Sequence, residues 1–326
     1  SATTVQVGDL NGDRIADIFF GNSRDEKRHD VPSHIYWGGP RGYAPYRRQA
    51  LAGFGTIGSG LADLNRDGWP DILMVNHESG KHETMPAVVF WGNLDHHYSS
   101  ALATLLDVKP RMEHSVADLD DDGFVDLVFL SERSAHSFVV WGSTEGFNTI
   151  TNKKDLTELP VISPMSSSVA DLNRDGFLDI LFTVEKQIDT QQRVLAVILW
   201  GNGQRYEGAR TTEWELSSLS SLANAIADLN RDGFLDLVIP EGFRPRFPEP
   251  GEKVTPTTGR VLWGSQDGFS TANQLVLTLQ THFSQSVNIA DLTDPDRIRY
   301  QDYFAGVDAV VHLGYKRRSD DPLDAF

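Results

Sequence analysis

The chain has 326 residues, no cysteine and a formal net charge of −17 at pH 7, with 46 acidic against 29 basic side chains. A chain without cysteine has no disulfide framework and no zinc or thiol site built on cysteine. It also has no basic stripe to contact phosphates, so nucleic acid is not an expected partner.

Membrane and targeting signals are also missing from the sequence. No apolar stretch reaches the roughly 18 to 20 residues that a transmembrane helix needs, so no membrane span is expected. The N-terminal Ser1-Ala2-Thr3-Thr4 does not resemble a signal peptide. We therefore expect a soluble chain that is a mature or trimmed product.

An acidic loop recurs along the chain and divides it into repeats. The loop begins at Asp9, Asp63, Asp118, Asp171, Asp228 and Asp291, at separations of 54, 55, 53, 57 and 63 residues. A nearly constant period of this size is typical of a repeat architecture. We predict a single domain of six repeats, with approximate bounds 1–54, 55–109, 110–162, 163–219, 220–281 and 282–326.

Each of the first five repeats contains segments that favour four short β-strands. One apolar run enters the loop, a second follows it directly, and a third, rich in β-branched and aromatic residues, ends in Trp-Gly. A weaker alternating segment, such as 212–216 or 274–279, favours a fourth strand with one exposed face. Because the apolar residues of the third run are consecutive, both faces of that strand are expected to be covered. The Trp side chains that end the third strands are predicted to pack between repeats, and they are Trp37, Trp91, Trp141, Trp200 and Trp263.

These elements predict the fold class. No segment has the periodicity of a convincing amphipathic helix, so the chain is expected to be all-β. Four strands per repeat, arranged radially at a period near 50 residues, are typical of a β-propeller blade. The prediction is a β-propeller of four-stranded blades with six visible repeats.

The loop from Asp171 to Asp179 shows the chemistry of the repeated motif. Side-chain oxygens at its first, third, fifth and ninth positions, a backbone carbonyl at the seventh and glycine at the sixth form the oxygen cage that Ca²⁺ prefers. Two carboxylates about 4 Å apart repel by roughly 4 kcal/mol at an effective dielectric constant near 20, so a cation is expected between them. Solvated surface acid is the alternative interpretation. About five Ca²⁺ ions are predicted, one per intact loop. The predicted ligands are Asp9, Asn11, Asp13 and Asp17; Asp63, Asn65, Asp67 and Asp71; Asp118, Asp120, Asp122 and Asp126; Asp171, Asn173, Asp175 and Asp179; and Asp228, Asn230, Asp232 and Asp236.

Two loops depart from the pattern. The first has Arg14 where the others have glycine, and a non-glycine residue with positive φ costs roughly 1 kcal/mol, so weaker binding is expected there. The last loop has Thr293 at its third position and its closing aspartate three residues late. It is expected to form an altered or weak sixth site from Asp291, Asp296 and Asp302, or none.

The repeated Asp-Leu-Asn-x-Asp-Gly-Phe-x-Asp loop, the Trp-Gly strand and a Gly-aromatic turn after it resemble the FG-GAP/VCBS repeats of integrin α-subunit propellers and of many bacterial surface proteins. The resemblance extends from Val5 to about Gly314. It implies a propeller with Ca²⁺ in the loop between the first and second strands of each blade. Such propellers usually have seven blades, so a seven-bladed ring completed by a missing segment or a partner is the alternative to six.

The connections between second and third strands are expected on the face opposite the calcium loops. Variable loops on a rigid scaffold often carry binding residues. The charged residues of these connections are Arg24, Arg28, His29, His34, His77, Glu78, His82, Glu83, Arg133, His136, Arg244 and Arg246, with Phe243 and Phe247 in the long connection 240–259. Plain solvated loop surface is the alternative for each of them.

Two function classes remain open. The favoured one is a non-catalytic, calcium-stabilised recognition module that binds a protein or glycan through the loop face, assembles with itself, or belongs to a larger parent protein. Open loops of this kind bind Ca²⁺ with dissociation constants of roughly 10⁻⁴ to 10⁻³ M in extracellular modules, so an extracellular, cell-surface or periplasmic location is expected. The alternative is a polysaccharide lyase or hydrolase, which a converging His, Tyr and Arg set at the propeller mouth would favour.

Overall fold

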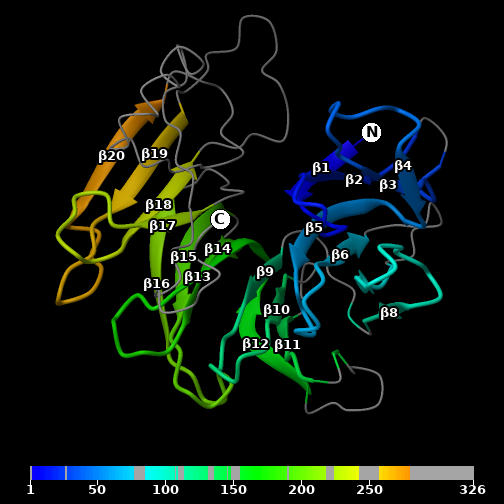
Figure 1. The fold of residues 1–326 in the computed structure, drawn as a ribbon. Helices are drawn as coiled ribbons and strands as arrows, with labels where there is room; N and C mark the ends of the chain where they lie inside the picture. Colours follow the sequence, from blue (N-terminus) through cyan, green and yellow to red (C-terminus); the bar gives the residue numbers. More distant parts are fainter. Residues whose placement is uncertain are drawn as a thin grey trace, which may run out of the picture. The chain divides into compact units, whose positions relative to one another are not determined.

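A computed structural model describes residues 2–279 except 26–27, 77–84, 107, 109–113, 131–135, 145, 148–154, 189–190, 218–223 and 242–256. Within these ranges the regular elements are β-strands, β1 to β20 (Figure 1). They form five four-stranded antiparallel sheets. The predicted all-β class and the four strands per repeat are confirmed for these five repeats. The sixth repeat lies outside the described residues, so the number of blades in the domain stays a prediction.

The strands of each sheet are consecutive in the sequence, so each sheet is built from one repeat. The first sheet contains β1 (Ala2–Gly8), β2 (Asp17–Asn22), β3 (Ser33–Tyr36) and β4 (Arg48–Leu51). The second contains β5 (Thr56–Ala62), β6 (Asp71–Asn76), β7 (Val88–Phe90) and β8 (Ala103–Leu105). The third contains β9 (His114–Ala117), β10 (Asp126–Phe129), β11 (His136–Val140) and β12 (Leu156–Ile162). The fourth contains β13 (Pro164–Ala170), β14 (Asp179–Ile188), β15 (Gln191–Leu199) and β16 (Thr211–Ser217). The fifth contains β17 (Ala225–Ala227), β18 (Asp236–Glu241), β19 (Thr257–Leu262) and β20 (Gln274–Leu279).

The chain divides into two compact units. One consists of Ser1–Val184 with Val197–Thr212 and holds the first three sheets and part of the fourth. The other consists of Glu185–Ala196 with Glu213–Phe326 and holds the fifth sheet.

The second sheet shows how neighbouring repeats share a core in the first unit. Every residue of β6 is buried. Alternate side chains of a strand point to opposite faces, and accordingly Ile72 packs in a cluster with Phe19 of the first sheet, whereas Leu73 packs in a cluster with Phe129 of the third. The second strand of an inner repeat is therefore apolar without alternation because both of its faces are covered.

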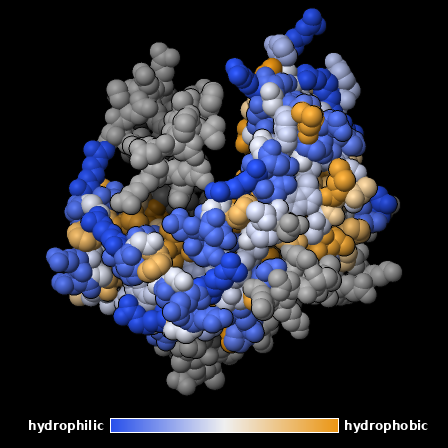
Figure 2. All heavy atoms as spheres, turned by 60° about the horizontal axis from the view of Figure 1, so that its bottom comes forward, coloured by the Kyte–Doolittle hydropathy of each residue, from blue (hydrophilic) through white to orange (hydrophobic). Residues whose placement is uncertain are grey.

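The first sheet is different, because only one of its faces is covered within the described part of this unit. In β2, buried residues alternate with half-buried ones. In β1, Val5 and Val7 are 54% and 63% exposed. Figure 2 shows a face of the molecule where hydrophilic side chains predominate and apolar ones gather in smaller areas.

Three of the five tryptophans that end the third strands pack between repeats, as predicted. Each of these three stacks on the aromatic residue of the turn that follows Trp-Gly in the next repeat. The ring centroids are 6.4 Å apart for Trp37 and Tyr98, 6.2 Å for Trp91 and Phe147, and 6.3 Å for Trp141 and Tyr206. The indole N–H of Trp91 also donates to Thr104 Oγ1 in its own repeat at 2.9 Å, and Trp141 and Trp200 make the corresponding bonds to Thr157 and Thr212. Trp91, Trp141 and Trp200 are therefore bonded to their own fourth strands, and Trp37, Trp91 and Trp141 contact the following repeat.

Candidate metal-binding loops

Five acidic loops connect the first and second strands of the five sheets. They are loop one (9–17), loop two (63–71), loop three (118–126), loop four (171–179) and loop five (228–236). Because successive strands are antiparallel, each loop lies at the same end of its sheet as the Trp-Gly turn between the third and fourth strands. The second-to-third connections lie at the other end.

The closing aspartate of each loop is fully buried and joins two segments of the backbone. In loop two, Asp71 Oδ2 accepts the N–H of Leu64 in the same loop, and Oδ1 accepts the N–H of Gly92 in the Trp-Gly turn, both at 2.7 Å. The other four closing aspartates bind their own loop and their own Trp-Gly turn in the same way, and they are Asp17, Asp126, Asp179 and Asp236. All five have no exposed surface. The ninth position therefore holds the loop against the third strand.

The glycine of Trp-Gly is needed for this contact. A Cβ atom at Gly92 would collide with the carbonyl oxygen of Pro70, the residue before the closing aspartate. The same collision with the eighth loop residue occurs in the other four repeats, at Gly38, Gly142, Gly201 and Gly264. Sequence reasoning identified this glycine only as the end of a strand. Its recurrence beside each acidic loop was the available signal that it has a second role.

Burial makes the closing carboxylates hard to ionise without a cation. It raises the pKa of Asp71 and Asp126 to about 7 and that of Asp179 to about 6, although the two backbone hydrogen bonds oppose the shift. The other carboxylates of each loop raise these pKa values further. Burial also raises the pKa of Asp17 and Asp236. A bound cation would favour the ionised form of all five.

Loop four illustrates the hydrogen bonds of the outer positions. Asp171 Oδ2 accepts the N–H of Gly176 at 3.0 Å. The side chain of Asn173 accepts the N–H of Asp175 at 2.9 Å and donates its amide N–H to Asp175 Oδ2 at 2.8 Å. Loops one, two and five have the same asparagine-to-aspartate bond, at 3.3, 3.1 and 2.9 Å. The third and fifth positions are thus joined directly in four of the five loops.

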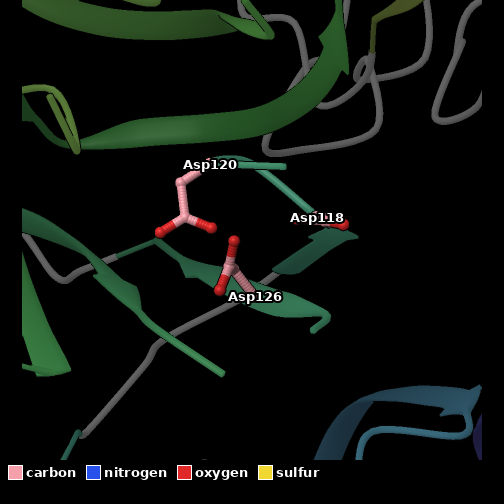
Figure 3. A group of neighbouring side chains, drawn as sticks. All are labelled: Asp118, Asp120 and Asp126. Atoms are coloured by element: carbon pink, nitrogen blue, oxygen red, sulfur yellow. The ribbon is translucent and has the colours of Figure 1, made fainter. Parts of the chain in front are cut away.

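Loop three brings its carboxylates together. It has Asp120 at the third position, and one ligand oxygen from each of Asp118, Asp120 and Asp126 lies within 4.8 Å of the others. In Figure 3 the carboxylates of Asp120 and Asp126 point toward one another. Asp118 Oδ1 is buried without a hydrogen-bond partner, and burial raises the pKa of Asp118. Converging carboxylate oxygens with an unpaired buried oxygen fit a hard cation such as Ca²⁺. The fourth predicted ligand, Asp122, is not in this group.

Loop one has its glycine at the fourth position and a non-glycine residue at the sixth, the reverse of the other four loops, and backbone conformation accounts for both positions. Arg14 does have a positive φ, of 65°. Loops two to five, however, also contain one non-glycine residue in this region, at the fourth position, with φ between 58° and 63° (Arg66, Asp121, Arg174 and Arg231). Loop one has Gly12 at that position, where a Cβ atom would lie 2.9 Å from the ring of Trp69 in the next repeat. The number of strained residues is the same in all five loops, so steric strain does not distinguish loop one.

Several candidate residues lie outside the described part of the chain. They are Asp291, Asp296 and Asp302 of the sixth loop and, in the connections, His77, Glu78, His82, Glu83, Arg133, Arg244, Arg246, Phe243 and Phe247. Among the described connection residues, Arg28 is exposed and lies 3.8 Å from Asp25 and 3.7 Å from Asp30. His136 lies 3.5 Å from Glu158.

A His, Tyr and Arg set does converge, on the face of the first sheet. Arg48 Nη1 donates to Tyr36 Oη at 3.3 Å, and the rings of His34 and Tyr36 are 6.3 Å apart. Burial and the charge of Arg48 lower the pKa of His34. The hydrogen bonds of this set join Arg48 to Tyr36 and His34 to Asn22, and among the described residues none joins His34 to Tyr36, so the two rings do not form a direct relay.

Consecutive four-stranded antiparallel sheets, each with an acidic loop between its first and second strands, define a repeat protein built from β-propeller blades. The family described as the FG-GAP-like repeat matches residues 9–74 and 118–182. FG-GAP-like repeats are therefore present in two regions of the chain, as the sequence motif indicated.

Three relatives share this similarity. The T-cell immunomodulatory protein of Mus musculus is 25% identical over 205 residues, which cover 62% of this chain and 32% of the relative. Protein linkin of Caenorhabditis elegans is 23% identical over 270 residues, covering 72% of this chain and 40% of the relative. The T-cell immunomodulatory protein homolog of Plasmodium yoelii yoelii is 30% identical over 138 residues, covering 38% and 19%. The matched part is thus less than half the length of each relative.

Among the described residues, none belongs to a helix with the length and apolar character needed to cross a bilayer.

Proposed function

We propose that the chain is part of a calcium-stabilised interaction module that works outside the cytosol, in the extracellular space or at a cell surface, and binds a protein partner. The observation that carries this proposal is the common construction of the five acidic loops. Each has a buried closing carboxylate, and loop three has oxygens that already converge. The names of the relatives, an immunomodulatory protein and linkin, are in keeping with an interaction role.

In loop three, Asp118, Asp120 and Asp126 would hold the ion. Asp126 accepts two backbone N–H groups, but each carboxylate oxygen has a second lone pair, so a ligand role is compatible with these bonds. In the other loops the corresponding aspartates and asparagines are the proposed ligands. When bound, Ca²⁺ supplies the positive charge that offsets the repulsion among the carboxylates.

The proposed partner surface is formed by the second-to-third connections, at the sheet ends away from the acidic loops. The calcium loops then stiffen the scaffold, and the connections carry the specificity. Exposed Arg28 and half-exposed His136 are among its described polar members. A glycan ligand or assembly with a second copy are the other occupants to test.

The enzyme alternative gains one observation, the convergence of His34, Tyr36 and Arg48. The set projects from the face of a sheet, and within the described residues no hydrogen bond joins His34 to Tyr36 for a direct proton relay. Polysaccharide cleavage that is lost in Tyr36→Phe would reverse the preference.

The experiment that tests the proposed function combines metal analysis with a calcium titration followed by calorimetry. We expect about one ion per intact loop, and a melting temperature that falls on chelation and recovers with Ca²⁺ but not with Mg²⁺. No bound ion and no change of melting temperature would contradict the proposal. The partner surface is tested by binding to intact cells with Arg28→Glu and His136→Glu variants, with Asp267→Lys, in the turn after β19, as the surface control.

A further inference from the structure

Loop three differs from the other four loops in how its outer positions are joined. Elsewhere the third-position asparagine donates an amide N–H to the fifth-position carboxylate. Loop three has Asp120 at the third position, and a carboxylate has no N–H to donate. Its bond to the backbone N–H of Asp122 is retained, at 3.3 Å, but the two side chains carry the same charge.

An arginine from the next repeat places a positive charge beside the two acidic outer positions. Arg205 lies in the turn between β15 and β16, and its Nε and Nη2 atoms are each 2.8 Å from Asp120 Oδ2. Nη2 is also 3.7 Å from Asp122 Oδ2. The Asp120 side chain is only 12% exposed. The guanidinium group thus binds the third-position carboxylate and lies close to the fifth-position carboxylate.

Packing against two repeats holds Arg205 in this position. Its Cζ atom is 4.7 Å from the centroid of the Trp141 ring, which belongs to the third repeat. The next residue, Tyr206, stacks on the same tryptophan and donates its hydroxyl to Leu178 O at 2.7 Å. A planar, stacked guanidinium with fixed neighbours retains its geometry better than a flexible surface cation.

The corresponding place beside loop one is occupied differently. There, His96 precedes the stacking residue Tyr98 by two positions and lines a hollow of about 330 Å³ together with Asn11 and Asp13. Loop one has the amide of Asn11 at its third position, and the residue beside it from the following repeat is His96. Loop three has Asp120 instead of an asparagine, and the residue beside it from the following repeat is Arg205.

We propose that Arg205 is a positioning residue and a fixed counter-cation for loop three. From the neighbouring repeat it offsets the repulsion between Asp120 and Asp122, so loop three keeps its outer positions together without metal. Because the guanidinium repels a second cation nearby, loop three also gains less from Ca²⁺ than its number of carboxylates would predict. This last statement rests on the proposed calcium binding, whereas the first does not.

The first test is a double-mutant cycle in the metal-free full chain, in the presence of chelator. Arg205→Ala should lower the melting temperature by about 2 to 4 °C. In the Asp120→Asn background, where the loop has its own amide, the same change should cost much less. The lost stacking on Trp141 is common to both backgrounds and cancels in the cycle. Equal losses in the two backgrounds would overturn the proposal.

The second test measures calcium. Arg205→Ala should increase the rise in melting temperature on adding Ca²⁺, and calorimetric titration should show several-fold tighter binding at one site. Arg205→Lys keeps the charge without the planar guanidinium, and its calcium affinity should lie between those of the parent and Arg205→Ala. Arg210→Ala is the matched control, because Arg210 stacks on Trp200 at 5.3 Å in the same turn.

The outcomes separate the two proposals. If Ca²⁺ changes no variant while the metal-free cycle shows coupling, the proposed calcium function fails and the positioning role of Arg205 is retained. If Ca²⁺ stabilises every variant by the same amount, the counter-cation role fails and the calcium function is retained. If the Arg210→Ala control behaves like Arg205→Ala, the effect comes from ring stacking and the inference is wrong.

Discussion

The acidic loops have an inner end, the closing aspartate at the ninth position, and an outer end, the first to sixth positions. The two ends differ in burial and in how far their residues vary from loop to loop. At the inner end, the closing aspartate is fully buried in all five loops and binds the same two backbone N–H groups. At the outer end, the side chains are exposed or half-buried, and the third and fourth positions change from loop to loop. From this difference we infer that the inner end fixes the blade whether or not metal is bound, and that the outer end would set the affinity for the proposed metal.

The largest expected effect is at the inner end. Asp71→Ala leaves the N–H groups of Leu64 and Gly92 buried without acceptors, and unpaired buried groups cost about 1 to 3 kcal/mol each. The free energy of unfolding should fall by about 3 kcal/mol or more, with and without Ca²⁺. Denaturant unfolding measures it, with Asp67→Ala at the outer end of the same loop as the control. A loss confined to the calcium-bound protein would make Asp71 a ligand only.

A slightly smaller effect is expected from the glycine that contacts the inner end. Gly92→Ala places a Cβ atom against the carbonyl oxygen of Pro70 and should destabilise the fold by about 1 to 3 kcal/mol. Gly68→Ala is the matched control, because it meets open space and has only a positive φ of 89°, which costs about 1 kcal/mol. If Gly68→Ala proved the more damaging of the two in denaturant unfolding, the close approach at Gly92 would not be the constraint.

Protonation of the closing aspartates at the inner end should make the stability of the metal-free protein depend on pH. Because burial raises the pKa of Asp71 and Asp126 to about 7, the folded metal-free protein keeps protons there that the unfolded chain releases. This contribution to stability is complete below about pH 4 and is lost as the pH rises through about 7, by about 1 kcal/mol per site between pH 6 and 7.5. Saturating Ca²⁺ favours the ionised carboxylates and should reduce the loss. Melting temperatures across this range, with and without Ca²⁺, check the sign, and a metal-free stability that rises with pH would refute it.

The sequence predicted the features that depend on residue types and their spacing within a single repeat. The four strands, the position of the acidic loop and the tryptophans between repeats follow from residue types within one repeat. Asp118, Asp120 and Asp126, which converge in loop three, belong to a larger predicted ligand set, and the ligand role of every residue in that set stays a prediction. Loop chemistry depends on neighbours in sequence, so a single repeat is enough to recognise it.

The features that the sequence did not predict depend on contacts between distant segments. The bond from Gly92 to Asp71 joins residues 21 positions apart, and the bond from Arg205 to Asp120 joins residues 85 positions apart in different repeats. Likewise, Gly12 is explained only by Trp69 of the following repeat. Within one repeat, Arg205 is an ordinary turn residue, and nothing in its local spacing relates it to an aspartate in the preceding loop.

The smallest effect is expected at the outer end, in loop four, where Asp175→Ala removes one proposed ligand and an acceptor of Asn173. Saturation at a hundred times the dissociation constant contributes about 2.7 kcal/mol per site, so weakening one site tenfold should lower the stability in Ca²⁺ by about 1 kcal/mol. In chelator the variant should match the parent closely, because an exposed hydrogen bond contributes little and a repulsive charge is removed with it. Calorimetric titration should find one weakened site. A full set of unchanged sites, or an equal loss in chelator, would mean that the outer end serves the fold as the inner end does, and the distinction between the two ends would fail.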